Sequence, residues 1–284
     1  MEEIFKRTQE KSYECPKPQN SCGASGDLCR RHGARKSGFG VSSLLGRLTA
    51  DVVWGSKQLS DRFRCIAVDL RGWGKSDRHN EDYNLFTQAD DVEGVIEELN
   101  LMDFVFVGHS MGGKIAQILA GRRPVGLRAV LLVAPAPPTP LNVPDTQKQS
   151  MLNSYTTPEG IGDALKVISH KPLTLAQRLQ VTEDSLGGAQ TAKVAWISHG
   201  MGLDISKESA SITVPICVIV GSEDQVEKEA ALREAFLPLV PHAKFETIAG
   251  VGHLSPLEGS DEVAEVISDF LAEQQRSANE KGRT

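Results

Sequence analysis

The chain has 284 residues, of which 40% are hydrophobic and 24% are charged, and its formal net charge at pH 7 is −6. A chain of this size can bury one large core without help from disulfides or a structural metal. The acidic balance and the lack of a basic stripe argue against a nucleic-acid partner. Nowhere do about 18 apolar residues run together, so the sequence predicts no membrane span.

The first forty residues differ in composition from the rest of the chain. Residues 1–40 show neither a helical nor a strand period, so we expect an irregular or flexible extension outside the core. The amino terminus lacks the apolar segment of a secretory signal, and we therefore expect a cytoplasmic protein. Cys15, Cys22 and Cys29, followed by His32, are residue types that bind zinc, but the paired C-x2-C spacing is missing. We expect free thiols, no metal and no cofactor.

From residue 41 onward, apolar runs alternate with amphipathic helices. The run 63–70 predicts a buried strand that ends in a glycine-rich turn, RGWGKSD (71–77). A helix is predicted to begin at Thr87, with Asp90 and Asp91 in its first turn, where carboxylates suit the helix dipole. The other elements continue the alternation, with strands over 41–46, 103–110, 128–136, 216–221 and 244–250, and helices over 111–123, 228–236 and from 260 onward.

This alternation predicts an α/β fold, with a mostly parallel central sheet covered by helices on both faces. The interval 137–210 interrupts it, and the mostly helical pattern there predicts an insertion between two strands of the sheet. We therefore expect the extension (1–40), one domain over 41–275 that contains the insertion, and a polar carboxyl-terminal tail (276–284).

The segment Gly108-His109-Ser110-Met111-Gly112 matches the pattern G-x-S-x-G. An apolar strand leads straight into it and an amphipathic helix leaves it, which is the context of a nucleophile elbow. Such a sharp turn needs flanking positions that are nearly free of side chain. It would present Ser110 at the carboxyl end of the sheet and at a helix amino terminus, where an anion is stabilised. We predict that Ser110 is a nucleophile.

A nucleophilic serine needs a base, and the base needs an acid that orients it. Both residue types follow Ser110 in the chain order Ser, Asp, His. Asp224 lies just after the predicted strand 216–221, with Glu223 as its rival, and His253 lies just after the next strand. Because the carboxyl ends of parallel strands share one edge of a sheet, we predict that Ser110, His253 and Asp224 form a catalytic triad.

The most informative segments together resemble the α/β-hydrolase superfamily, and in particular its esterase, lactonase and cofactor-free perhydrolase branches. They are DLRGWGKSD (69–77), VGHSMGGKIAQ (107–117), LLVAPAPPTP (131–140), VIVGSEDQV (218–226) and AGVGHL (249–254). The resemblance covers about residues 41 to 275. It implies that the insertion is a lid and that the Met111 N–H is one donor of an oxyanion hole. It also implies a second donor just after a His-Gly pair that ends an early strand.

The chain departs from the superfamily at this second donor. The position of the His-Gly pair is occupied by Leu45-Gly46-Arg47, and the Arg47 N–H is the remaining candidate donor. The opening strand hairpin of the family also has no counterpart in residues 1–40. An amide rather than a particular side chain forms the hole, so we still expect Met111 and Arg47 to provide it.

These observations predict a serine hydrolase that cleaves a small carboxylic ester, lactone or thioester through an acyl-serine intermediate. A small-molecule ester is the expected partner. The insertion would supply a substrate pocket or ordinary lid core through four large side chains: Met151, Tyr155, Trp196 and Met201. Two alternatives stay open: a perhydrolase or C–C hydrolase that uses the same triad, or a non-catalytic ligand-binding relative with a defective oxyanion loop. The oligomeric state stays open as well.

Overall fold

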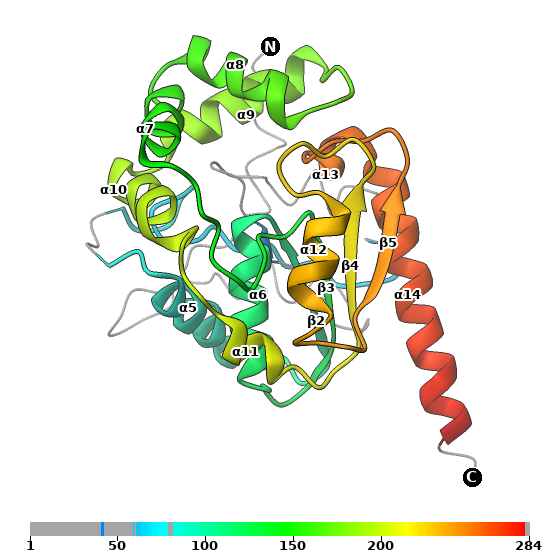
Figure 1. Cartoon of the computed structure of the whole chain (residues 1–284). Coiled ribbons are helices and arrows are strands. Elements are labelled where there is room, and N and C mark those ends of the chain that lie inside the picture. Colours follow the sequence, from blue (N-terminus) through cyan, green and yellow to red (C-terminus); the bar gives the residue numbers. More distant parts are fainter. Residues whose placement is uncertain (1–40, 43–58, 60, 79–81, 282–284) are drawn as a thin grey trace.

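The structure is a computed structural model that describes residues 41–42, 59, 61–78 and 82–281. In this part of the chain, five parallel strands form one sheet in the spatial order β1-β2-β3-β4-β5 (Figure 1). The strands are β1 (Val41–Ser42), β2 (Phe104–His109), β3 (Leu127–Val133), β4 (Ile216–Gly221) and β5 (Lys244–Ile248). Every residue of β2 and β4 is buried, which explains why both are continuous apolar runs in the sequence.

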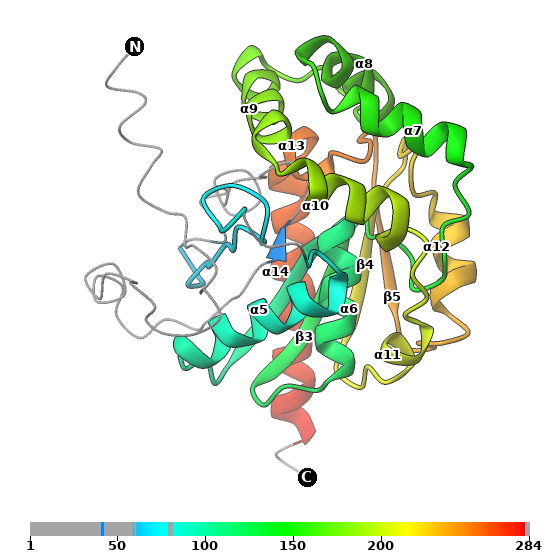
Figure 2. The same ribbon diagram turned by 90° about the vertical axis from the view of Figure 1, so that its left-hand side faces the viewer.

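Helices cover both faces of the sheet. They are α5 (Leu85–Glu98), α6 (Met111–Gly121), α12 (Glu229–Phe236) and α14 (Ser260–Lys281). Because strands that are neighbours in the sheet also follow one another in the chain, right-handed crossovers bring α6 and α12 to the same face. Phe104 and Phe106 pack in the core cluster that includes α5, α6 and α12, whereas Val105 and Val107 pack in the cluster that includes α14. This alternation places α14 on the opposite face, as Figures 1 and 2 show.

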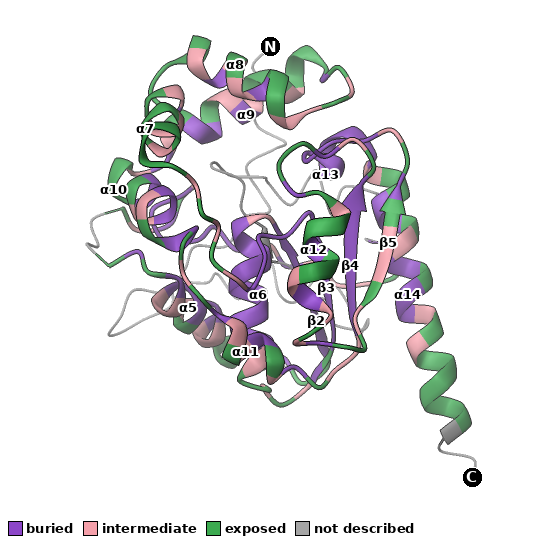
Figure 3. Ribbon diagram, viewed as in Figure 1, coloured by how far each residue is buried: buried purple, intermediate pink, exposed green. Residues whose placement is uncertain are grey.

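A helical segment connects β3 to β4, inside the interval 137–210. Its elements are α7 (Asp145–Ser154), α8 (Pro158–Ile168), α9 (Leu175–Gly187), α10 (Gln190–Val194), a π-helix (Ala195–Gly200) and α11 (Ser206–Ala210). In Figures 1 and 2, α7, α8 and α9 lie beyond the carboxyl ends of the strands. This part of the molecule is more exposed than the sheet (Figure 3), and α7 buries none of its residues. The helices α7, α8 and α9 therefore lie above the edge of the sheet at which the candidate catalytic residues are found.

Two expectations for individual elements were wrong. The helix α5 begins at Leu85 rather than at Thr87, because the Asn84 side chain caps it by accepting a hydrogen bond of 2.9 Å from the Thr87 N–H. The carboxylates therefore lie beyond the first turn, and Asp91 binds Arg71 instead. The run 63–70 forms isolated bridges rather than a continuous strand.

Other expectations concern the ends of the chain. The helix α14 continues to Lys281, so most of the predicted polar tail is helical. The extension over 1–40, the missing opening hairpin and the Leu45-Gly46-Arg47 loop lie outside the described residues. None of the described helices is both long and apolar enough to cross a bilayer.

Candidate active site

Ser110 occupies a strained turn between β2 and α6. Its backbone angles, φ 51° and ψ −119°, lie in a region that side chains rarely adopt and that costs about 1–3 kcal/mol. The turn also brings two backbones into contact: a Cβ atom on Gly108 would lie 2.5 Å from the Gly112 carbonyl oxygen. A hydrogen bond of 3.2 Å from the Ser110 N–H to the Val133 carbonyl ties the turn to β3. Gly108, the first glycine of the G-x-S-x-G pattern, is therefore required by space.

Three side chains meet at this turn. His253 Nε2 lies 3.0 Å from Ser110 Oγ, and His253 Nδ1 lies 2.9 Å from Asp224 Oδ2. Both His253 and Asp224 are buried. The second carboxylate oxygen of Asp224 accepts hydrogen bonds from the N–H groups of Val226, at 2.7 Å, and Glu227, at 2.9 Å. The structure therefore brings the three residues predicted for a triad into one chain of hydrogen bonds.

The charge state of Asp224 follows from these contacts. Burial alone would raise the pKa of its carboxyl group, but the hydrogen bond and charge of His253 and the two backbone donors outweigh burial and lower it. Asp224 is therefore ionised at neutral pH and fixed toward one nitrogen of the imidazole. A carboxylate in this position favours the tautomer that leaves Nε2 free to accept the proton of Ser110.

Backbone contacts between two loops select Asp224 over its neighbour. The Ser222 N–H donates to the Ile248 carbonyl, at 2.9 Å, and the Glu223 N–H donates to the Val251 carbonyl, at 3.0 Å. These bonds join the loop after β4 to the loop that carries the histidine. The Glu223 side chain accepts a hydrogen bond from the Ser222 hydroxyl and is half-buried, whereas Asp224 reaches the imidazole.

Two further residues support the histidine loop. His109 is buried, and its Nε2 lies 2.9 Å from the His253 carbonyl oxygen, with the two rings 5.2 Å apart. Glu258 Oε2 accepts hydrogen bonds from the N–H groups of Gly252, His170 and Lys171, at 2.9, 2.9 and 2.8 Å. Glu258 therefore joins the residue before His253 to the loop between α8 and α9 of the helical segment.

A cavity of about 490 Å³ opens beside the serine. It is lined by Ser110, Met111 and His253 from the sheet edge and by residues of the helical segment. All four side chains predicted for a pocket line it: Met151, Tyr155, Trp196 and Met201. Met111 is also the first residue of α6, so its N–H has no carbonyl partner in the preceding turn of that helix. Arg47, the other predicted oxyanion donor, lies outside the described residues.

Comparison with known proteins identifies the family. The sequence pattern described as alpha/beta hydrolase fold matches residues 48–260. The chain belongs to this family. The AB hydrolase superfamily protein YisY of Bacillus subtilis (strain 168) is 29% identical over 221 residues, which are 73% of this chain and 81% of the relative. The non-heme chloroperoxidase of Streptomyces lividans is 28% identical over 224 residues, with 69% and 76% of the two chains covered.

A solved structure agrees with this alpha/beta hydrolase assignment. An esterase from Exiguobacterium antarcticum matches with a TM-score of 0.76 at 19% sequence identity, covering 85% of this chain and 93% of the esterase. The fold class predicted from the alternation of strands and helices is thereby confirmed, as is the resemblance carried by the five sequence segments.

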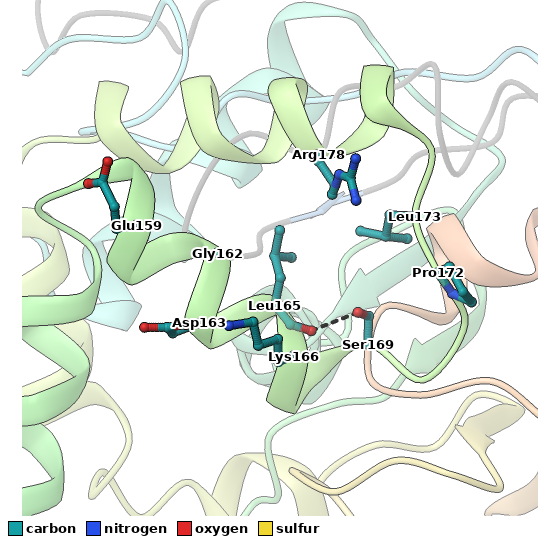
Figure 4. A pocket seen from close by; sticks show the side chains of 9 residues that line it. All are labelled: Glu159, Gly162, Asp163, Leu165, Lys166, Ser169, Pro172, Leu173 and Arg178. Carbon is teal, nitrogen blue, oxygen red and sulfur yellow. Dashed lines mark hydrogen bonds and ion pairs between the residues drawn. The ribbon is translucent and has the colours of Figure 1, made fainter.

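This alpha/beta hydrolase has a second hollow, of about 520 Å³, within the helical segment (Figure 4). It lies between α8 and α9, and Leu165, Leu173 and Arg178 are among the residues that line it. The lining of this hollow includes none of Ser110, Asp224 and His253, so the hollow is separate from the candidate active site. Among the described residues, no cluster of three or more His, Cys, Asp or Glu side chains could hold a metal ion.

Sequence reasoning missed two buried charged residues beside the cavity. Glu227 lines the cavity wall, and burial, together with the charge of Asp224, raises the pKa of its carboxyl group to about 8. Lys114 of α6 is fully buried, and burial lowers the pKa of its amine to about 8 against the opposing charges of Glu227 and Asp204. A lysine within the apolar helix that follows the elbow was a visible signal. Glu227, in the polar run DQVEKE, gave none.

Proposed function

We propose that the protein is a serine hydrolase that cleaves small carboxylic esters, with Ser110 as nucleophile, His253 as base and Asp224 as the orienting acid. The observation that carries this proposal is the chain of short contacts from Ser110 Oγ to His253 and on to Asp224. Membership of the alpha/beta hydrolase fold family and the elbow geometry of Ser110 support it.

The reaction proceeds in two halves. Ser110 Oγ attacks the ester carbonyl while His253 Nε2 takes the hydroxyl proton, and the tetrahedral intermediate then expels the alcohol, which receives that proton. Water repeats the sequence on the acyl-serine and releases the acid. Asp224 stabilises the imidazolium that forms in each half. The N–H groups of Met111 and Arg47 are the donors we propose for the oxyanion.

The helical segment over 137–210 acts in this proposal as a lid that forms the substrate pocket. Tyr155, Trp196 and Met201 are buried and Met151 is half-buried, so the wall opposite Ser110 is largely apolar. An apolar wall favours a small acyl or alkyl group over a charged one, because burying an unpaired charge is costly.

Peracid formation is a second candidate activity. The observation that favours it is the similarity to a non-heme chloroperoxidase over 69% of this chain. The same acyl-serine would be attacked by hydrogen peroxide instead of water, and the triad would keep its roles. Hydrolysis of an ester in the presence and absence of peroxide, with the peracid measured directly, compares the two acceptors.

The test of the proposed function is turnover of p-nitrophenyl acetate and p-nitrophenyl butyrate. We expect Ser110→Ala and His253→Ala each to reduce kcat/KM by at least about 10³-fold. Ser277→Ala, which removes an exposed hydroxyl from α14, is the matched control and should leave kcat/KM unchanged. Ester turnover that is equal in the wild type and Ser110→Ala would contradict the assignment.

A further inference from the structure

Glu227 is a buried carboxyl group in the cavity beside Ser110, and the proposed reaction gives it no role. It is 5% exposed and lines the same cavity as Ser110 and His253. Its backbone N–H donates to Asp224 Oδ1 at 2.9 Å, so the loop that carries it is fixed to the candidate triad. Among the residues that the structure describes, its carboxyl group takes part in neither a hydrogen bond nor an ion pair within 4 Å.

Because no described residue bonds to the Glu227 carboxyl group and Glu227 lines the cavity, water or a ligand must provide its hydrogen bonds. Much of the cavity lining is apolar, with Val143, Trp196 and Met201 among its residues. A ligand that brings a hydrogen-bonding group to Glu227 therefore gains more than one that places a methyl group there. This difference is the physical basis of selection between substrates of equal size.

The surroundings of Glu227 also influence whether its carboxyl group is protonated when it binds a ligand. Burial and the nearby ionised Asp224 hold its pKa at about 8, although Lys114 acts in the opposite direction. The Lys114 amine itself donates to the Met201 carbonyl, at 3.4 Å, so the lysine is held beside the cavity wall. With its pKa raised, the Glu227 carboxyl group keeps its proton to higher pH than an exposed glutamate does, and the protonated form can both donate and accept a hydrogen bond.

We propose that Glu227 is a specificity-determining residue, which forms a hydrogen bond with a neutral polar group, such as a hydroxyl, on the substrate ester. This inference rests on the proposed ester hydrolysis and adds the class of substrate to it. A hydroxyl group matches a protonated carboxyl group because each can donate to and accept from the other. The natural substrate is then a hydroxylated ester rather than a plain alkyl ester.

The experiment compares esters that differ by hydroxyl against methyl at one position. On the acyl side the pair is p-nitrophenyl 3-hydroxybutyrate and p-nitrophenyl 3-methylbutyrate. On the alcohol side the pair is 2-hydroxyethyl butyrate and propyl butyrate, followed by acid release. In at least one pair we expect kcat/KM to favour the hydroxyl ester by about tenfold or more. Glu227→Leu should bring that ratio to about one or below, and Glu227→Ala should do the same.

Two variants separate hydrogen bonding from a structural role. Glu227→Gln keeps a neutral group that donates and accepts, so it should retain the preference. Gln147→Leu removes an exposed polar side chain from the same cavity, where water can already satisfy it, and should not change the ratio. Because each ratio compares two substrates on one enzyme sample, partial unfolding of a variant cancels.

Three results would overturn the inference: no hydroxyl preference in either pair, a preference that survives both Glu227→Leu and Glu227→Ala, or a preference lost in Glu227→Gln. The plain alkyl esters report separately on the proposed function. If Ser110→Ala abolishes their turnover while the ratios fail, the serine hydrolase stands and the role of Glu227 falls. If their turnover survives Ser110→Ala, the proposed function itself is wrong.

Discussion

The edge of the sheet and the helical segment above it are built on different principles. At the sheet edge, buried strands end in loops that hydrogen-bond to one another, and Ser110, His253 and Asp224 are fixed by backbone contacts. In the helical segment, α7 buries no residue, and Val167, Leu175 and Leu179 are each at least 60% exposed. The sheet edge therefore fixes the proposed chemistry, whereas the segment over 137–210 supplies a cavity wall that sequence change can reshape without disturbing the proposed nucleophile.

The largest loss of activity should come from a change at the sheet edge, where Asp224 Oδ2 fixes the tautomer of His253. Asp224→Asn replaces the ionised oxygen opposite His253 Nδ1 by a neutral amide, so we expect kcat for ester hydrolysis to fall by roughly 10³ to 10⁴-fold. The control is Glu223→Gln, which changes the adjacent carboxylate and should alter kcat far less. If the Glu223 variant were instead the inactive one, the acid would be assigned to the wrong residue.

A smaller loss of activity should follow from removing the Glu258 contacts that join the histidine loop to the helical segment. Glu258→Ala leaves the N–H groups of Gly252, His170 and Lys171 without their shared acceptor. We expect the free energy of unfolding to fall by about 2–3 kcal/mol and kcat to fall severalfold, because Gly252 precedes His253, the proposed base. Urea unfolding and ester turnover measure the two effects. Unchanged values in both would show that the helical segment and the histidine loop are held together by other contacts.

Glu227 in the cavity wall should make the free energy of unfolding depend on pH. The raised pKa of Glu227, about 8, means that the native state holds this proton more tightly than the unfolded chain does. Its contribution to the free energy of unfolding is therefore present at acid pH and is lost as pH rises toward 8. Between pH 5 and pH 7, the free energy of unfolding of Glu227→Gln should rise relative to that of the wild type by about 2.5 kcal/mol. A difference between the two proteins that is constant with pH would contradict a raised pKa.

The smallest effect is expected within the helical segment. Thr174 caps α9 and forms a capping box with Gln177, in which each side chain binds the backbone of the other. Thr174→Ala should lower the free energy of unfolding by about 1 kcal/mol and leave kcat for small esters unchanged. A large fall in kcat would mean that the order of α9 matters for the reaction itself, and the distinction between the two regions would fail.

The sequence predicted the features that depend on strand order and local pattern. Ser110, Asp224 and His253 could be found because each follows a predicted strand, and parallel strands bring such ends to one edge. The start of α5 was misplaced because the capping by Asn84 competes with other plausible polar residues nearby. Glu227 could not be found, since its burial depends on packing between distant parts of the chain, which its neighbours in sequence do not reveal.

The central claim, that Ser110 is the activated nucleophile, is tested most directly by labelling with a fluorophosphonate and locating the adduct by peptide mass spectrometry. We expect one adduct per chain, on the peptide that contains Ser110, slower labelling in His253→Ala and none in Ser110→Ala. An adduct on another residue, or equal labelling of Ser110→Ala and the wild type, would contradict the account.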